Sequence, residues 1–187
     1  MKAALCRDFG KPLTIEEVAL DGPGLGQVQV KMAACAICHS DIAYADGYWG
    51  GALPMVLGHE AAGIVMEVGP GVRGFAKGDR VLVTLIRACG SCSACRTGAP
   101  TSCEHAWVRD ATPLHSKDGP IAQGMSTAAF AEAVTVDQSQ VVALPSGIDM
   151  AAASLLSCGV LTGVGAVTNT ARLRTGETCA VGPTAAA

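Results

Sequence analysis

The sequence predicts a mainly β fold with some α+β elements, arranged as an antiparallel barrel or sandwich and followed by a helix. Short β-rich segments alternate with turn signals through the first 145 residues, as in all-β domains. Glycine is abundant (23 residues) and aromatic residues are scarce (4%), which suits a domain rich in turns. The pattern then changes beyond residue 149, where apolar residues recur at helical spacing.

The predicted strands lie between glycine-containing turns. Their segments read VQVKMAACAIC, AAGIVMEVG, DRVLVTLI and FAEAVTVD, and the turn signals are GPG, GPGVRG and KGD. Residues Gly69 to Gly74 also satisfy G-x-G-x-x-G, a pattern found in nucleotide-binding loops. A phosphate site of that kind needs a helix to begin there, whereas another predicted strand follows. We therefore interpret this stretch as a β-turn.

The stretch 150–171 carries no charge and, by length alone, could span a bilayer. Polar side chains and glycines interrupt the stretch, and Asp149 is a plausible N-cap. A buried helix is the favoured interpretation, with Leu156, Val160, Val164 and Val167 at helical spacing. The apolar segment 178–182 is expected to open a strand. We accordingly divide the chain into residues 1–149 and 150–187.

Charge and cysteine usage exclude several classes of protein. The net charge is −3 and no run of Lys or Arg occurs, which argues against a nucleic-acid partner. The N-terminus lacks the apolar core of a signal peptide because Arg7 and Asp8 interrupt it. Nine cysteines without an export signal indicate a reducing, cytoplasmic setting in which thiols act as ligands.

Four cysteines share one short loop, Cys89, Cys92, Cys95 and Cys103, in the spacing C-x2-C-x2-C-x7-C. Thiolates this close can converge on one tetrahedral zinc ion in a closed, structural site. An iron–sulfur cluster also uses C-x2-C-x2-C, although its usual last gap is three residues and ends in Cys-Pro. Unliganded thiols are a third alternative. A closed site performs no chemistry, so the loop alone does not indicate an enzyme.

Two further stretches, CAICHSD and LGHEAAG, gather Cys38, Asp41 and His59 with other polar groups. A catalytic metal needs about three protein ligands and one open position. Taken singly, a cysteine or a histidine is more often a core residue than a ligand. Local sequence alone therefore leaves these residues undecided.

The ordered motifs CHSD, GHEAAGIVMEVGPGV, GDRV, the four-cysteine loop and SCGVLTGVGAV together resemble the zinc-dependent medium-chain alcohol dehydrogenases. The segment GPIAQGMSTAAFAEAVTV is similar to the liver-type and class III-like branch. This resemblance implies a GroES-like β-barrel catalytic domain, an interdomain helix and the first strand of an incomplete Rossmann coenzyme domain. It also implies that the chain is truncated at the start of that domain.

The resemblance assigns seven residues to two zinc ions. Those of the catalytic zinc would be Cys38, His59 and Cys158, and those of the structural zinc would be Cys89, Cys92, Cys95 and Cys103. It also implies roles for residues around the catalytic metal. Glu60 would lie behind the metal, Asp41 would orient His59, and Ser40 would accept the alcohol proton. His39 would contact the coenzyme pyrophosphate, and the substrate pocket would be lined by Trp49 and Leu85. Many relatives continue the proton relay with a histidine where this chain has Ala43, which puts the relay beyond Ser40 in doubt.

The implied activity is NAD(P)-linked oxidation of an alcohol to an aldehyde or ketone by hydride transfer from a zinc-bound alkoxide. The implied partners are a small alcohol or aldehyde and, for the full-length parent, a second copy of itself, with neither nucleic acid nor membrane. One alternative is a thiol-adduct formaldehyde dehydrogenase of the S-hydroxymethyl-glutathione type. Another is a non-catalytic zinc-binding module, because the coenzyme domain that the family carries is absent from this sequence. The 187-residue chain by itself is expected to be nearly inactive.

Overall fold

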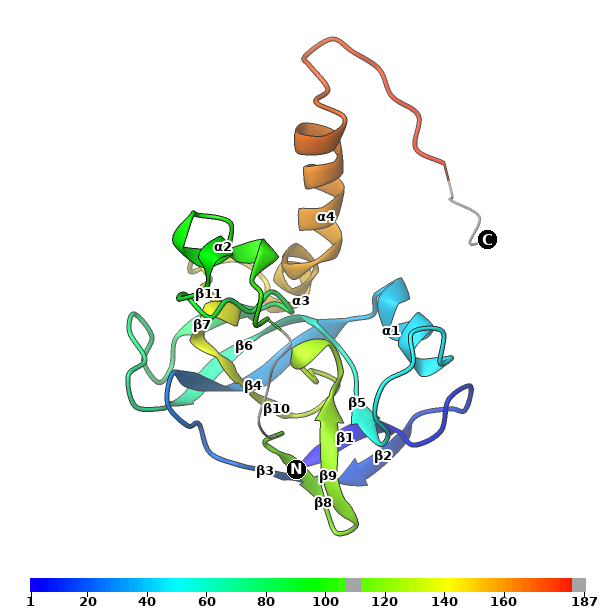
Figure 1. Ribbon diagram of the computed structural model, residues 1–187, viewed down its shortest axis with the longest axis vertical. Helices are drawn as coiled ribbons and strands as arrows, with labels where there is room; N and C mark the ends of the chain where they lie inside the picture. The colour runs from blue at the N-terminus through cyan, green and yellow to red at the C-terminus, as the bar shows by residue number, and fades with distance from the viewer. Residues whose placement is uncertain (107–111, 183–187) are drawn as a thin grey trace.

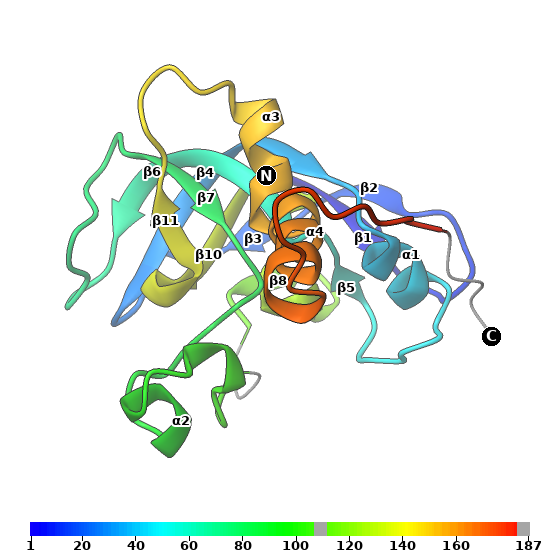
Figure 2. The same ribbon diagram turned by 90° about the horizontal axis from the view of Figure 1, so that it is seen from above.

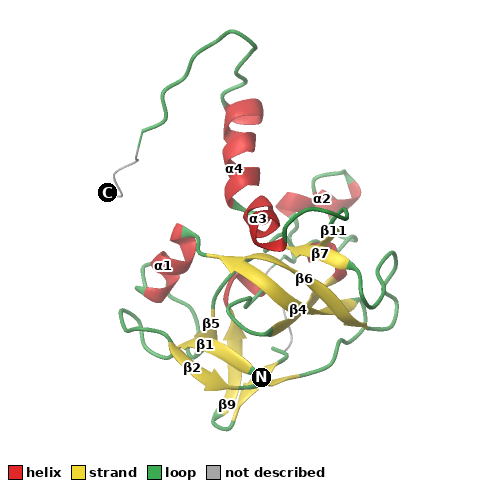
Figure 3. Ribbon diagram, turned by 180° about the vertical axis from the view of Figure 1, so that it is seen from behind, coloured by secondary structure: helices red, strands yellow, loops and turns green. Residues whose placement is uncertain are grey.

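The computed structural model describes residues 1–106 and 112–182, and its strands form two sheets that wrap around a barrel-like core (Figures 1 and 3). The larger sheet has the order β2-β1-β5-β9-β8-β3, formed by Thr14–Glu17, Lys2–Cys6, Met55–Val56, Gly119–Gln123, Leu114–Ser116 and Ala19–Leu20. The other sheet has the order β10-β4-β6-β7-β11, formed by Ala133–Asp137, Gln27–Ala36, Glu60–Val68, Arg80–Val83 and Val141–Ala143. The predicted mainly β fold is therefore confirmed.

The four predicted strands appear as β4, β6, β7 and β10. Their β-branched side chains point alternately inward, as the period of two requires, and form one valine-rich core. That core contains Val28, Val30, Val65, Val81, Val83, Val134, Val136 and Val141. Strand pairing is antiparallel throughout the described residues except between β5 and β9, which run parallel.

The glycine-rich stretch after β6 is a turn, as predicted, and no helix begins there. Gly69 donates its amide to the Gln27 carbonyl at 2.8 Å, which ties the turn to the start of β4. A Cβ atom on Gly69 would lie 1.8 Å from the Gly24 carbonyl oxygen. The glycine thus permits close approach of two backbones and has no evident phosphate-binding role.

The predicted helix begins where expected but is not continuous, and only its first part is partly buried. Asp149 caps α3 (Met150–Ser154) by accepting a hydrogen bond from the Ala152 amide at 2.8 Å. A 3₁₀ turn (Leu155–Ser157) follows, and after Cys158 the chain continues as α4 (Gly159–Gly165) and a π-helical turn (Ala166–Thr170). The two halves are bent by 49°, and α4 rises away from the barrel (Figure 1).

The expectation of a buried helix is wrong for α4, because nothing in the described part of the chain covers it. No residue of α4 is buried, and Val164 is 54% exposed. No single described helix is long and apolar enough to cross a membrane. The bent pair Met150–Ser157 and Gly159–Thr170 reaches that threshold by length and composition alone.

The predicted strand at residues 178–182 is also wrong, since this segment has no regular structure. A strand needs a neighbour to pair its backbone amides and carbonyls, and no described segment lies beside it in that way. The last five residues of the predicted second domain, 183–187, lie outside the described residues. The division between residues 149 and 150 stays a prediction.

Candidate metal centres

The register between two central strands brings the first pair of predicted ligands together. Strands β4 and β6 are antiparallel, and Ala36 at the end of β4 pairs with Glu60 at the start of β6. Cys38 lies two residues beyond the end of β4, as the N-cap of helix α1 (His39–Ala45), and His59 immediately precedes β6. Both side chains therefore come from the same end of the sheet.

Helix α3 packs over that end of the sheet and delivers the third ligand. Ala153 of α3 is buried against Ala62 of β6 and Leu144. The bend that follows α3 contains Cys158. The donor atoms of Cys38, His59, Glu60 and Cys158 all lie within 4.8 Å of one another.

His59 provides a test of whether these residues suit a metal ion. Its side chain is fully buried, and neither ring nitrogen has a hydrogen-bond partner in the described structure. A buried polar group left unpaired costs roughly 1–3 kcal/mol, and coordination of a metal by one nitrogen would remove much of that cost. Two thiols and one imidazole are also donors that zinc accepts in catalytic sites. The donor set therefore fits a zinc ion.

Asp41 organises the backbone around these donors. Its Oδ2 accepts a hydrogen bond from the Cys38 amide at 2.9 Å, and its Oδ1 accepts one from the Gly58 amide at 2.9 Å. The same Oδ1 lies 3.4 Å from Nδ1 of His59 without forming a regular hydrogen bond. A single buried carboxylate thus contacts the chain next to two donors.

Burial and neighbouring negative charge raise the pKa of Cys158. Desolvation is the larger cause, and the proximity of Cys38 and Glu60 adds to it, so that the pKa rises to about 11. Without a cation this thiol stays protonated at neutral pH. Binding of a divalent ion here is therefore expected to release a proton.

The other cluster consists of Cys89, Cys92, Cys95 and Cys103. The segment that carries them, residues 89–103, is called the four-cysteine lobe here and projects to one side of the barrel (Figure 2). Its sulfur atoms also lie within 4.8 Å of one another, and all of its cysteines are free thiols. Backbone amides point at the sulfurs: Cys92 donates to Cys89 at 3.3 Å, and Cys95 of α2 (Ser93–Arg96) donates to Cys92 at 3.5 Å. Amides directed at sulfur favour thiolate over thiol, as a metal requires.

Local hydrogen bonds and burial give these thiols different pKa values. The Ser91 hydroxyl and nearby amides lower the pKa of Cys89 to about 5, and the Cys95 amide lowers the pKa of Cys92. Desolvation and the Cys92 thiol raise the pKa of Cys95 to about 12. At neutral pH the Cys89 thiol is therefore ionised, whereas the neighbouring Cys95 thiol would ionise only beside a cation.

A family model described as the alcohol dehydrogenase GroES-like domain matches residues 24–146. The chain belongs to this family.

The GroES-like chain is 36% identical over 186 residues to putative alcohol dehydrogenase D of Mycobacterium tuberculosis. It is 35% identical over 191 residues to alcohol dehydrogenase class-3 of Drosophila melanogaster. Each match covers 96% of this chain and 50% of the relative, so the chain spans about half the length of these curated relatives.

Solved structures agree with the GroES-like assignment. An alcohol dehydrogenase zinc-binding domain protein from Burkholderia ambifaria superimposes with a TM-score of 0.88 at 33% identity, covering 95% of this chain and 50% of that chain. Benzyl alcohol dehydrogenase from Acinetobacter calcoaceticus gives a TM-score of 0.79 at 27% identity, covering 90% and 47%. The predicted fold and family are confirmed.

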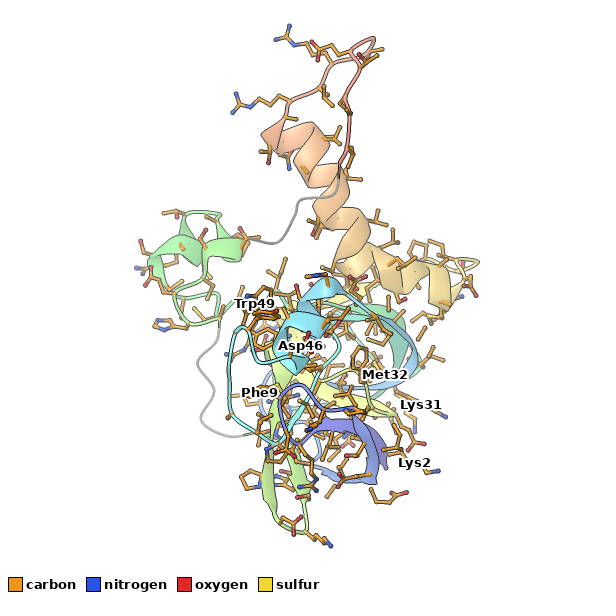
Figure 4. The ribbon with its side chains drawn as sticks, turned by 90° about the vertical axis from the view of Figure 1, so that its right-hand side faces the viewer. Lys2, Phe9, Lys31, Met32, Asp46 and Trp49 are labelled. Carbon is orange, nitrogen blue, oxygen red and sulfur yellow. The ribbon has the colours of Figure 1, made fainter. Side chains whose placement is uncertain are left out.

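Other predicted residues of the GroES-like domain lie near the buried cluster or at the surface. Ser40 is half-buried in α1, and His39 is exposed as the first residue of that helix. Trp49 is 58% exposed and meets the Tyr44 ring edge-on, with centroids 5.0 Å apart, beside α1 (Figure 4). Leu85 packs against the same apolar cluster as Tyr44. Ala43, at the position of the missing relay histidine, is buried.

The sequence analysis missed Thr84, which hydrogen-bonds to the backbone next to Cys158. The signal available was weak: one polar residue within the apolar run VLVTLI. Such a residue becomes notable only when its hydroxyl is seen to have a specific partner.

Proposed function

We propose that this chain is the metal-binding, catalytic portion of a zinc-dependent alcohol dehydrogenase that oxidises an alcohol to an aldehyde or ketone with NAD or NADP. The observation that carries the proposal is the convergence of Cys38, His59 and Cys158 around a histidine whose buried ring nitrogens lack partners. A zinc ion held there would act as a Lewis acid on a substrate oxygen and lower its pKa.

Each surrounding residue has a distinct part in this proposal. Two thiolates and a neutral imidazole balance a divalent charge, and Asp41 orients the His59 ring through Nδ1. The Ser40 hydroxyl accepts the proton that leaves the alcohol. Ala43 offers no group to pass this proton on, so it would leave through water. His39 would contact the coenzyme pyrophosphate from its exposed position on α1.

Glu60 is the fourth donor near this site, and its carboxylate is almost completely buried. We assign it a place behind the metal, where its negative charge would add to that of the two thiolates. Its carboxylate also borders Gly159: a Cβ atom there would lie 3.5 Å from Glu60 Oε2. Glu60 thus lies between the barrel and the start of α4.

We assign Trp49 and Leu85 to the substrate pocket, because Trp49 meets the Tyr44 ring and Leu85 packs against the same buried cluster as Tyr44. The four-cysteine lobe would hold a second, structural zinc ion. Its amide-to-sulfur bonds and its four closely spaced thiols support that role. We further propose a cytoplasmic location and self-association of the longer protein that carries this domain.

The first experiment counts metal ions in the zinc-loaded chain by elemental analysis. We expect two per chain in the wild type, one in His59→Ala and one in Cys95→Ser. A wild-type chain without zinc would overturn the proposal.

The next experiment separates an enzyme from an inert zinc module. Zinc is replaced by cobalt, whose visible spectrum reports its ligands, and imidazole is added. An open catalytic position predicts a spectral change that is absent in His59→Ala and present in Cys95→Ser. A closed module predicts no change in either. NAD(P)-linked alcohol oxidation by the longer protein, abolished by His59→Ala, tests the activity itself.

A further inference from the structure

Cys158 follows the 3₁₀ turn Leu155–Ser157, which contacts β6 and β7 but leaves most of its own side chains exposed. The residues around it are largely exposed, including Leu155 and Leu156 before it and Val160 after it. Helix α4, which follows, contains no buried residue. The backbone that leads into Cys158 is therefore held mainly through the turn Leu155–Ser157, in which Ser157 is buried.

Thr84 supplies a direct link from the barrel. It follows strand β7, and its hydroxyl donates a hydrogen bond to the Ser157 carbonyl at 3.2 Å. This hydrogen bond connects the barrel to the backbone of the turn before Cys158. The bonded carbonyl belongs to the peptide unit that leads into Cys158.

Both partners of this bond are themselves held firmly. The Ser157 side chain is buried, and its hydroxyl donates to the Ser154 carbonyl at 2.7 Å, which closes the end of α3. Gln140 binds both backbone groups of Thr84. The Thr84 amide donates to the Gln140 carbonyl at 3.0 Å, and the Thr84 carbonyl accepts a hydrogen bond from Gln140 Nε2 at 2.9 Å.

Gln140 anchors Thr84 to a third part of the barrel. Its side chain is fully buried and also donates to the Ser126 carbonyl at 3.0 Å. The Thr84 hydroxyl accepts the Ile86 amide at 3.4 Å, which restricts the direction in which it can donate. The hydroxyl therefore projects from a rigid frame.

We infer that Thr84 is a positioning residue, whose hydroxyl fixes the Ser157 carbonyl and thereby aims the Cys158 sulfur at the metal. The inference rests on the proposed function, because it requires an ion at Cys38, His59 and Cys158. Metal sites depend on ligands held close to their productive geometry. Loss of the hydroxyl frees the peptide before Cys158, and the ligand then has to be ordered when the metal binds.

The test compares Thr84→Val, which keeps the shape but removes the hydroxyl, with Thr135→Val. Thr135 is a matched control because its hydroxyl also donates to a backbone carbonyl, that of Asp21 at 3.0 Å, and lies away from both clusters. Its side chain is fully buried, whereas that of Thr84 is half-buried. Zinc affinity is measured by competition with a chromogenic chelator, and the four-cysteine site serves as the internal reference in each sample.

We expect Thr84→Val to weaken the site containing Cys158 by about 10-fold or more, as loss of supporting contacts around metal ligands commonly does. The four-cysteine site should be unchanged. Thr135→Val should lower the melting temperature without changing either zinc affinity, and Thr84→Ser should restore wild-type affinity. In the cobalt form, Thr84→Val should alter the thiolate charge-transfer band of the buried site.

Equal zinc affinities in Thr84→Val and the wild type would overturn the inference, as would equal losses in Thr84→Val and Thr135→Val. If Thr84→Val does not fold, Thr84→Ser and Thr84→Ala form a second pair that differs only in the hydroxyl. A wild-type chain that binds no metal at the buried site would overturn the proposed function as well. A wild type that binds metal while both Thr84 pairs behave alike would overturn this inference alone.

Discussion

The Asp41 carboxylate lies 3.4 Å from Nδ1 of His59, and the two side chains are 3% and 0% exposed. The same carboxylate accepts the amides of Cys38 and Gly58. Asp41 therefore connects two candidate ligands that lie next to the ends of neighbouring strands, β4 and β6. Its contribution is structural as well as electrostatic, which makes it a sensitive point for substitution.

Substitution of Asp41 by alanine should weaken the buried metal site and the fold together. We expect about a 10–100-fold loss of zinc affinity at this site, since the His59 ring loses its orienting partner. We also expect a loss of about 1–3 kcal/mol in the free energy of unfolding, because two amides lose their acceptor. Chelator competition and urea unfolding measure the two effects. Asp41→Asn, which keeps an acceptor oxygen, should lose less of both, and wild-type affinity in Asp41→Ala would contradict this role.

Gly58 should tolerate no side chain because both its backbone and its surroundings exclude one. Its φ is +93°, and a Cβ atom would lie 2.7 Å from the Phe130 amide nitrogen. Gly78 is a matched control, since its φ is +97° and nothing lies within 4 Å of its Cβ position. Thermal or urea unfolding should show a loss of about 1 kcal/mol in Gly78→Ala, from the backbone alone. Gly58→Ala should lose roughly 1–3 kcal/mol more in the free energy of unfolding, because of overpacking. Equal losses in Gly58→Ala and Gly78→Ala would contradict this, since they would mean that the residues around Gly58 move to make room.

In metal-free protein, Cys89 should be the first thiol of the four-cysteine lobe to react with iodoacetamide. Its pKa of about 5 leaves it ionised at neutral pH, whereas the pKa of Cys95 at about 12 keeps that thiol protonated. Peptide mapping after timed labelling gives the two rates. Zinc should suppress labelling of Cys89 but not of the exposed Cys179, which lies outside both clusters. Preferential labelling of Cys95 would contradict the assignment.

The ion pair between Arg7 and Glu16 should make stability depend on acidic pH. Arg7 Nε and Nη2 contact the two Glu16 oxygens at 2.7 and 2.6 Å, and these bonds lower the pKa of Glu16 from 4.5 to about 2. Because the folded pKa lies below the unfolded one, the stabilisation is complete above pH 4.5 and is lost as pH falls toward 2. Urea unfolding of the wild type and Glu16→Gln should therefore converge over this interval. A constant difference between them would rule out this titration.

The four-cysteine lobe could be predicted from sequence because its ligands are neighbours along the chain. Short loops with glycines allow few arrangements of the backbone, and Gly90 and Gly98 both take positive φ values, 74° and 83°. The strands were predictable for a similar reason, since alternation of side chains is a local property. The buried cluster was different: only the resemblance to a family connected Cys38, His59 and Cys158 before the structure was known.

The sequence by itself determined which segments became strands, where the turn at Gly69 lies, and that α3 begins after Asp149. Tertiary structure alone decided that Ala36 pairs with Glu60, that the chain bends at Cys158, and that α4 stays exposed. The local pattern of apolar and polar residues indicates which face of a helix or strand is suited to burial. Burial itself, and the meeting of distant side chains, depends on which other elements pack against that face.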